Sequence, residues 1–360
     1  MKRIVLYLFF LITLSVYTSS GQNDSIDKKL SKTDSLRSDF TLFGSAELLN
    51  VTVRMDLTSY IRKNLKESSQ DAQLTIHLSD SDSMNLNTRV KYRGKFRFDN
   101  CGFPPMEVSF KKHLHAYSDT DKIKKIKLVT HCDAGNASDE YVLREYLVYK
   151  LFNTLSDTSY RVRLLRITYI DTELRKKTMT HYGFFIEPNN ILANRLKANE
   201  VKIKNLTQRY IKPDVMDRIS IFNYMVANWD WNIPNLQNVT VFKPYYIASP
   251  GSGIAVPYDF DLSGIVNPDY AVLPEEYGFK NSRDRIFLGI CRSKLDFLHD
   301  LQFFARKKKE MYDNINTFPY LNQKAKKDIT NHLDSFFMQL EKERSLEYLL
   351  DYFSDSCKQL

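Results

Sequence analysis

The sequence predicts an α+β fold in which a small β-rich lobe precedes a larger, mostly helical lobe. Apolar and polar residues alternate with a period of two in much of residues 42–188, as half-buried strands do. In residues 189–360 the apolar positions recur mainly at helical spacing. A run of strands followed by a run of helices is typical of α+β proteins. We expect the two lobes to join near Glu187 to Asn190.

The composition of the 360 residues is that of an ordinary globular protein. Apolar residues make up 43% and charged residues 26%, which excludes a wholly disordered chain. Gly and Pro number 11 each, which excludes collagen-like and linker-like chains. The net charge of +9 is dispersed and lacks an aromatic and basic module, so we expect no nucleic-acid partner. Tyr and Phe number 22 and 23, enough for large cores or a ring-lined binding surface.

The first 21 residues have the pattern of a secretory signal peptide. Lys2 and Arg3 precede an uncharged apolar run over residues 4–14, and small or polar residues follow as far as Gly21. The run is too short for a stable membrane span, although an uncleaved anchor is the alternative interpretation. No second long apolar stretch follows. We therefore expect an exported protein without a membrane span after cleavage, located in the periplasm, at the cell surface or outside the cell.

Export changes the interpretation of the four cysteines, Cys101, Cys132, Cys291 and Cys357. In an oxidising compartment an even number of cysteines indicates disulfides. Four cysteines allow three pairings. We favour a bond between Cys101 and Cys132 because both lie in the β-rich region.

The β-rich lobe follows a lead-in, residues 22–41, that is rich in Ser, Asp and Lys and that we expect to be flexible. Short alternating segments then predict strands, since β-branched and aromatic residues occupy every second position. The expected strands cover residues 49–55, 74–78, 90–93, 106–110, 126–129, 163–170 and 182–187.

Helices are predicted within and after the β-rich lobe. One has Ser138 as its N-cap and carries a leucine every four residues as far as Leu155. A second opens at Pro213, because Pro is favoured in the first turn. An irregular stretch with a short hairpin is expected over residues 228–260. The last hundred residues are expected to be helical, and residues 325–340 mark one amphipathic face.

Two segments of the helical lobe, residues 228–238 and 256–264, combine carboxylates and amides. Asp230 lies on the loop after a predicted helix, and Asp259 and Asp261 follow an apolar strand. Phosphoryl transfer to a hydroxyl needs one Asp that accepts or orients the hydroxyl proton, and an Asn and another Asp that hold Mg²⁺ against the phosphates. The sequence therefore indicates phosphoryl-transfer chemistry in this lobe.

The β-rich lobe offers groups that could bind phosphates. Arg93 precedes Gly94 in a predicted turn, where backbone N–H groups and cations can meet an anion. Lys111 and Lys127 lie on or beside strands, and Glu145 lies on the following helix. A Lys–Glu pair that orients the ATP phosphates is a recurring part of kinases.

These motifs resemble the catalytic and metal loops of protein-kinase-like folds, in particular those of the atypical secreted kinases of the spore coat protein H (CotH) family. The Arg93 turn, the strand that ends in Glu187, the segment at Asp230 and the segment Pro257–Asp261 occur in the order that this family shows. The resemblance spans roughly residues 45–350. It implies a two-lobed protein-kinase-like fold that uses ATP with Mg²⁺ or Mn²⁺.

The resemblance also implies roles for the polar residues of the helical lobe. Asp230 corresponds to the catalytic aspartate, Asp259 to the principal metal ligand and Asp261 to a second ligand or a support. Two asparagines compete for the remaining metal position. Asn235 has the five-residue spacing of the common kinase loop, whereas Asn238 directly precedes a predicted strand and is preferred.

The phosphate side departs from the kinase pattern. No Gly-rich loop and no Val-Ala-Ile-Lys strand are present, so the choice between Lys111 and Lys127 stays open and Arg93 is expected to share the phosphate contacts. Glu145 is the expected partner of the lysine, and Glu187 is placed on the nucleotide side of the site.

The expected function is metal-dependent transfer of the ATP γ-phosphoryl group to a hydroxyl of a protein or glycan acceptor. The alternative is a catalytically inactive kinase-like binding or scaffold protein of the periplasm or cell surface. The missing Gly-rich loop and the scarcity of ATP outside the cytoplasm favour that alternative. The Asp259-Phe-Asp261 sequence also matches the Asp-x-Asp of nucleotide-sugar glycosyltransferases, but the β-first order argues against their α/β fold.

Overall fold

The computed structural model describes residues 39–62, 69–133, 136–246, 249 and 251–357. The expected signal peptide and most of the lead-in lie outside these described residues. None of the helices within them combines the length and the apolar character that a membrane span requires.

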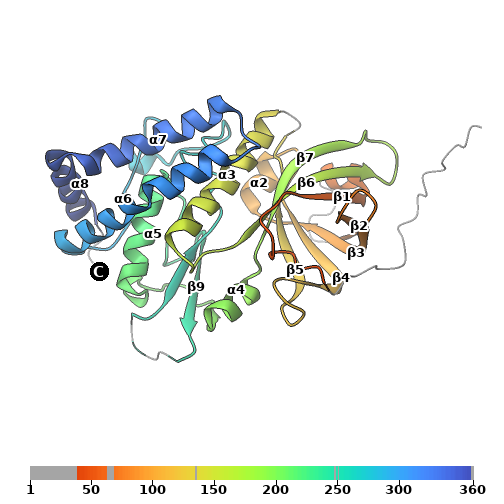
Figure 1. Ribbon diagram of the computed structural model, residues 1–360, viewed down its shortest axis with the longest axis horizontal. Coiled ribbons are helices and arrows are strands. Elements are labelled where there is room, and N and C mark those ends of the chain that lie inside the picture. Colours follow the sequence, from red (N-terminus) through yellow and green to blue (C-terminus); the bar gives the residue numbers. More distant parts are fainter. Residues whose placement is uncertain (1–38, 63–68, 134–135, 247–248, 250, 358–360) are drawn as a thin grey trace, which may run out of the picture.

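Seven strands of the N-terminal half form a closed β-barrel in the order β1-β2-β3-β4-β5-β7-β6 (Figure 1). Six of the neighbouring pairs are antiparallel, and the parallel pair of β1 with β6 closes the barrel. The barrel strands are β1 (Leu49–Met55), β2 (Gln70–His77), β3 (Ser83–Tyr92), β4 (Met106–His115), β5 (Lys122–Val129), β6 (Val162–Asp171) and β7 (Met179–Ile186).

The barrel encloses its own apolar core. Buried and partly exposed residues alternate along β1, so Val51 and Val53 lie inside while their neighbours face outward. The short helix α1 (Leu57–Ile61) adds the fully buried ring of Tyr60, and β7 adds that of Phe185. The alternation that predicted strands therefore also determines which side chains fill the barrel.

Helix α3 (Asn136–Leu155) leaves the barrel and contributes its leucine stripe to the larger core, where it contacts helix α6 (Lys294–Thr317). The predicted N-cap at Ser138 is wrong, because the helix begins at Asn136. The Ser138 hydroxyl instead accepts hydrogen bonds from the backbone N–H groups of Cys132 and Asp133, at 3.1 and 2.8 Å. It thereby holds the end of the segment that follows β5.

A three-stranded antiparallel sheet in the order β10-β9-β8 lies beside the helices. The β9–β10 pair confirms the hairpin expected within residues 228–260, whereas the short strand β8 has no predicted counterpart. Helix α5 begins at Pro213, as predicted. These elements are β8 (Ala198–Val201), β9 (Val239–Pro244), β10 (Ile254–Pro257), α4 (Asn189–Leu196) and α5 (Pro213–Met225).

The C-terminal hundred residues are mostly helical, as expected, and pack against α3 and α5. Helix α7 (Gln323–Glu341) starts at a cap in which the side chain of Asn322 accepts the Ala325 N–H at 2.8 Å. Helix α8 (Glu343–Ser356) contacts both α6 and α7. Three short helical segments complete the described elements: α2 (Lys95–Asn100), η1 (Gln208–Tyr210) and η2 (Glu275–Tyr277).

All four cysteines are joined in disulfides. The Cys101–Cys132 bond confirms the favoured pairing and links the end of α2 to the segment after β5. The Cys291–Cys357 bond links the segment before α6 to the end of α8. Two disulfides are consistent with an oxidising location outside the cytoplasm.

The structure is an α+β fold, but the two-lobed protein-kinase-like architecture implied by the resemblance is wrong. The N-terminal part is a closed mixed barrel of seven strands, and a separate three-stranded sheet accompanies the C-terminal helices. The barrel closes because β6 and β7 pair with each other and with β1 and β5, so that each of its seven strands has two neighbours. Alternation along single strands predicts their existence but not this closure.

Candidate functional site

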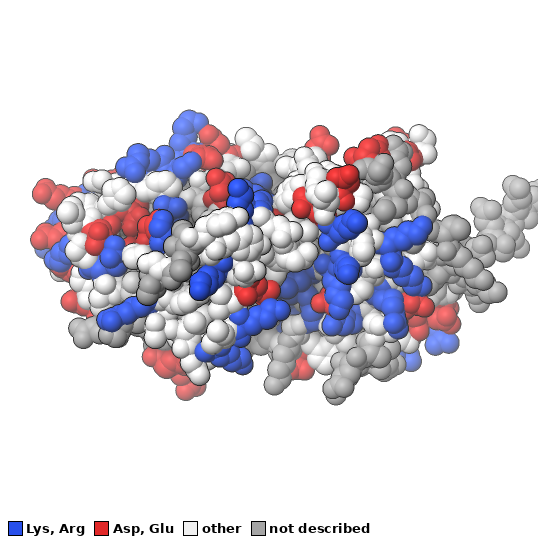
Figure 2. Space-filling view, turned by 90° about the horizontal axis from the view of Figure 1, so that it is seen from below, with Lys and Arg blue, Asp and Glu red and all other residues white. Residues whose placement is uncertain are grey.

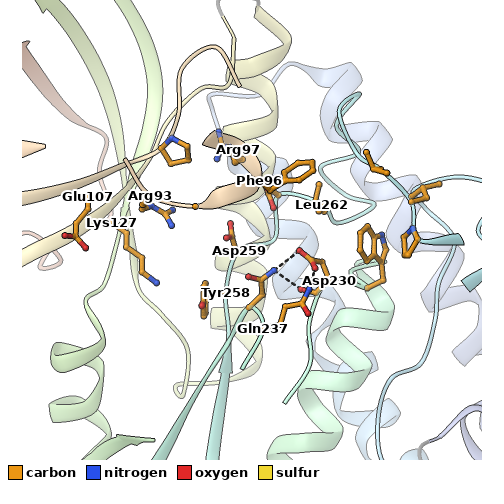
Figure 3. Close-up of a pocket in the computed structure, with 18 residues that line it drawn as sticks. Arg93, Phe96, Arg97, Glu107, Lys127, Asp230, Gln237, Tyr258, Asp259 and Leu262 are labelled. Carbon is orange, nitrogen blue, oxygen red and sulfur yellow. Dashed lines mark hydrogen bonds between the residues drawn. The ribbon is translucent and has the colours of Figure 1, made fainter. Parts of the chain in front are cut away.

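A cavity of about 770 Å³ lies where the barrel meets the helical part. Strands β4 and β5, the loop after β3 and the start of α2 line one side. The loop between α5 and β9 and the loop after β10 line the other. In the view of Figure 3, Arg93 and Lys127 lie on the barrel side, Asp230 lies on the opposite side and Asp259 lies between them.

The loop after α5 positions Asp230. Helix α5 ends at Met225, Val226 is its C-cap, and Ala227 takes a left-handed backbone conformation with φ of 53°. The buried side chain of Asn228 donates to Asn223 Oδ1 at 2.8 Å, which fixes the turn, and its Oδ1 accepts the Asp230 N–H at 3.3 Å. Asp230 therefore enters the cavity from a loop that is anchored on the last turns of the helix.

Two amide side chains hold the Asp230 carboxylate (Figure 3). Asn238 Nδ2 donates to Asp230 Oδ2 and to the Asp230 backbone carbonyl, both at 2.8 Å, and Gln237 Nε2 donates to Oδ1. Burial raises the pKa of Asp230, as does the nearby Asp259 carboxylate, while these two hydrogen bonds oppose the rise. A carboxylate with a raised pKa is a better proton acceptor than an exposed aspartate.

The structure distinguishes the two candidate asparagines. Asn238 lines the cavity, and its backbone carbonyl accepts the Tyr258 N–H at 2.9 Å, which joins the two cavity loops. Because both hydrogen bonds of its side chain leave from Nδ2, its Oδ1 is the atom that faces away from Asp230. Asn235 is exposed on the outer side of the loop, where its backbone N–H donates to Asn232 at 2.9 Å.

Asp259 and Asp261 flank an aromatic anchor. Phe260 is fully buried and packs edge-on against Tyr149 of α3 and Phe222 of α5, with ring centroids at 4.9 and 5.7 Å. The Asp259 N–H donates to the Tyr149 hydroxyl at 2.8 Å, and its backbone is left-handed with φ of 61°. Burial of Phe260 thereby places both aspartates at the wall of the cavity.

Asp261 is the more deeply buried of the two aspartates. Burial, followed by the negative charge of Asp259, raises its pKa from 3.8 to about 7, while the Arg97 guanidinium opposes the rise. The site therefore concentrates negative charge that a bound cation would compensate.

Of the two candidate lysines, only Lys127 lines the cavity. Its ammonium lies 4.3 Å from the ring centroid of Tyr258, and no ion pair joins it to any of the described residues. Burial and the positive charge of Arg93 lower its pKa from 10.5 to about 8. Lys111 instead lies on the outer surface, with its ammonium 4.0 Å from Asp71.

The two candidate glutamates have different environments. Glu145 is buried on α3, and its Oε1 has no hydrogen-bond partner among the described residues. Burial and the Asp261 charge raise its pKa well above the ordinary value. Within the described residues Glu145 forms no ion pair with Lys127, so the expected Lys–Glu pair is not formed in this structure.

Glu187 lies away from the cavity and has a structural environment. Its carboxylate accepts hydrogen bonds from Arg195 at 2.9 and 3.1 Å, from the Tyr117 hydroxyl at 2.9 Å and from the Arg161 backbone N–H at 3.0 Å. A buried carboxylate with this many donors stabilises the junction between β7 and α4.

Arg97 lines the cavity and was missed by sequence reasoning. It lies on α2, is buried, and donates through Nη2 to the Thr130 carbonyl at 2.5 Å. The charges of Asp261, Glu145 and Asp259 help to raise its pKa against the effect of burial. No local pattern distinguishes a buried arginine from an exposed one on a helix of six residues.

The donor set of the cavity is compatible with a divalent cation that also contacts phosphate. Among the described residues no three His, Cys, Asp or Glu side chains converge as a complete metal site. Mg²⁺ in nucleotide sites takes one or two carboxylates and leaves other positions to phosphates and water. Asp259 and Asp261, with Asn238 Oδ1, match that requirement.

Comparison with known protein families finds none that matches this chain. A search of the curated proteins likewise finds no significantly similar sequence.

Proposed function

We propose that this protein is an exported, metal-dependent phosphotransferase that moves the γ-phosphoryl group of ATP to a hydroxyl of a protein or glycan. One observation carries the proposal. Asp230, Asn238, Asp259, Asp261 and Lys127 come from distant parts of the chain and line the same cavity. The motif order that resembles the CotH kinases supports the same chemistry, although the barrel architecture differs from a kinase.

Asp230 is the residue that acts on the acceptor hydroxyl. Its carboxylate is held by Asn238 and Gln237, and burial raises its pKa. In the transfer step the acceptor oxygen forms a bond to the γ-phosphorus, the bond to the β,γ-bridging oxygen breaks, and the hydroxyl proton passes to Asp230. The products are the phosphorylated acceptor and ADP.

Cations on the barrel side bind the phosphates. Lys127 points into the cavity and has no carboxylate partner among the described residues, so it can pair with a phosphate without breaking an existing ion pair. Arg93 lies beside it, and its Nε has no hydrogen-bond partner among the described residues. A guanidinium suits bidentate contact with phosphate oxygens.

Asp259, Asp261 and Asn238 Oδ1 are the groups that would hold Mg²⁺ or Mn²⁺. When bound, the cation neutralises the charge that develops on the phosphates. The backbone of Asp259 is held by the hydrogen bond from its N–H to the Tyr149 hydroxyl, which places the residue at the cavity wall. Location in the periplasm, at the cell surface or outside the cell follows the predicted signal peptide and agrees with both disulfides.

The test combines thermal unfolding with detection of transfer from γ-labelled ATP to acceptor polypeptides or glycans. Mg²⁺ and ATP should together stabilise the protein, by about 2.7 kcal/mol at a hundredfold excess over Kd. Asp259→Asn should lose this stabilisation. Asp230→Asn should keep it and lose about 10²- to 10⁴-fold in transfer rate. Asn235→Ala in the same loop is the matched control and should change neither.

Full transfer by Asp230→Asn would refute the assignment of this residue. A second candidate function is a nucleotide-binding module without transfer, because both carboxylate oxygens of Asp230 already accept side-chain hydrogen bonds. That function would appear as metal-dependent stabilisation by ATP with no transfer by the wild-type protein. Stabilisation by a nucleotide sugar in place of ATP would instead indicate a glycan-active enzyme.

A further inference from the structure

The outer surface of strands β3, β4 and β5 carries cations in register with one another. The register aligns Arg89 with Ser109 and Lys125, and the next outward row aligns Lys91 with Glu107 and Lys127. We call Arg89, Lys91, Lys111 and Lys125 the basic strand face. Figure 2 shows Lys and Arg side chains gathered over the barrel half of this side of the molecule.

The basic strand face retains exposed positive charge after its internal ion pairs are counted. Glu107 lies 3.2 Å from Lys91 and 3.6 Å from Lys125, and Asp71 contacts the other two cations at 3.5 and 4.0 Å. The four cationic side chains are between 45% and 62% exposed. Two carboxylates cannot neutralise four cations, so the face attracts anions.

This face is continuous with the cavity. Glu107 and Lys127, which form one outward row with Lys91, also line the cavity wall, and so does Arg93 beyond the end of β3. A molecule that lies along the outward positions of these strands therefore meets the cavity wall at Glu107 and Lys127.

The spacing of the cations matches an extended polypeptide. Side chains two residues apart on one strand face lie about 6.7 Å apart, and the same distance separates every second side chain of an extended peptide. The outward positions 89 and 91 of β3 follow this spacing, and Arg93 comes two residues further along the chain, beyond the end of the strand. No Phe, Tyr or Trp occupies the outward rows described above, so the face lacks the stacking platform that single-stranded nucleic acids use.

We propose that the basic strand face binds an extended acidic segment of a polypeptide and leads it toward the cavity. This inference rests on the proposed phosphotransferase function in one respect, since it makes the acidic polypeptide the acceptor. The segment carries Asp or Glu at every second position, opposite the rows of the face, and the acceptor hydroxyl lies at its cavity end.

The experiment measures fluorescence anisotropy of a labelled peptide of alternating Glu and Ser, without nucleotide. The wild-type protein should bind this peptide, bind it less tightly as salt increases, and bind the matched peptide of alternating Gln and Ser much less. The triple variant Lys91→Gln, Lys111→Gln, Lys125→Gln should bind the acidic peptide about tenfold less tightly, given about 0.5 kcal/mol per exposed ion pair.

The matched control is Lys307→Gln, Lys308→Gln, Lys309→Gln on α6, which removes the same charge from a distant, partly exposed surface. It should change the affinity by about twofold at most. Equal losses in the two triple variants, or equal binding of the Glu and Gln peptides, would overturn the proposal. So would tighter binding of an oligothymidylate or of phosphatidylserine vesicles than of the acidic peptide.

The two proposals fail in distinguishable ways. The basic-face triple variant should keep the wild-type stabilisation by Mg²⁺ and ATP, because none of its three substituted lysines lines the cavity. Selective peptide binding without any phosphoryl transfer to the peptide would support the binding face and count against its role in delivering an acceptor. A third outcome would overturn the binding face alone. In it, the basic-face triple variant transfers phosphate to the peptide as fast as the wild-type protein does at low peptide concentration.

Discussion

The backbone N–H of Gly264 donates to the carbonyl of Ala227 at 3.0 Å, and this hydrogen bond joins the two loops that carry the site carboxylates. A Cβ added at Gly264 would lie 2.8 Å from the Ala227 Cβ and 2.9 Å from the Ser282 carbonyl. The left-handed backbone of Ala227 turns the chain from α5 toward Asp230. The distance between the two loops therefore depends on a contact that admits only glycine.

Gly264→Ala should destabilise the protein by about 1–3 kcal/mol, because backbone atoms must move to admit the methyl group. It should also weaken stabilisation by Mg²⁺ and ATP, since the aspartates of one loop shift relative to Asp230. Urea unfolding with and without the ligands measures both effects. Gly278→Ala is the control: Gly278 has φ of 63° but nothing within 4 Å of the added methyl group. It should cost about 1 kcal/mol and leave the ligand effect intact.

Asn238→Ala should raise the pKa of Asp230 further, because it removes the donor to Oδ2 from a buried carboxylate. The acidic limb of the pH–rate profile for transfer should move to higher pH. Loss of the two donated hydrogen bonds should also lower the free energy of unfolding by about 1–3 kcal/mol. Asn235→Ala should show neither change, and an unmoved acidic limb in Asn238→Ala would contradict the proposed role of Asp230.

The lowered pKa of Lys127 predicts opposite pH dependences for binding and for stability. The amine loses its charge as pH rises through about 8, so nucleotide affinity should fall there. Between pH values of about 8 and 10.5 the Lys127 amine is protonated in the unfolded chain but not in the folded protein. This group therefore makes the free energy of unfolding without ligand rise with pH over that range. Isothermal titration and urea unfolding over pH 7 to 10.5 measure the two trends.

Lys127→Arg supplies the control for this prediction, because its guanidinium stays charged throughout that range. The nucleotide affinity of this variant should not fall near pH 8. A wild-type affinity that does not change across pH 8 would show that the Lys127 amine makes no contact with the phosphates.

The two disulfides should differ in their effect on the site. Replacing either pair by serine should cost about 4 kcal/mol of stability, because the bonds span 31 and 66 residues. Only loss of Cys101–Cys132 should also weaken nucleotide binding. The Cys101 N–H donates to the Arg97 carbonyl at 2.9 Å. The Cys101–Cys132 disulfide therefore holds the helix that presents Arg97 to the cavity. The stabilisation by Mg²⁺ and ATP is measured for both double variants and compared at the same number of degrees below each melting temperature. This comparison separates loss of nucleotide binding from loss of stability.

The candidate site was more predictable from the sequence than the architecture around it. Asp230, Asn238 and Asp259 each stand at the end of an apolar segment, and such ends are where buried elements present polar groups. Glu187 also ends a strand, yet Arg195 and Tyr117 bind its carboxylate away from the cavity. A residue's position along an element predicts that it reaches a surface, not which partners meet it there.

The architecture depends on contacts between segments that are remote in sequence. Local alternation predicted the individual strands, but the pairing of β1 with β6 depends on backbone hydrogen bonds that carry no side-chain signature. Strand β8 has four residues, too few for a periodic pattern, and helix α2 has six. Arg97 on α2 is buried only because Thr130 and the carboxylates of other segments surround it.

The parallel pairing of β1 with β6 has a consequence for the order of folding. Residues 49–55 must wait for residues 165–171 before the last seam of the barrel can form. Until then the early strands present an unpaired edge to other chains, which favours aggregation. Such a distant pairing also slows folding, since a long loop must close before the contacts are gained. The edge of β1 therefore stays unpaired until β6 has been synthesised.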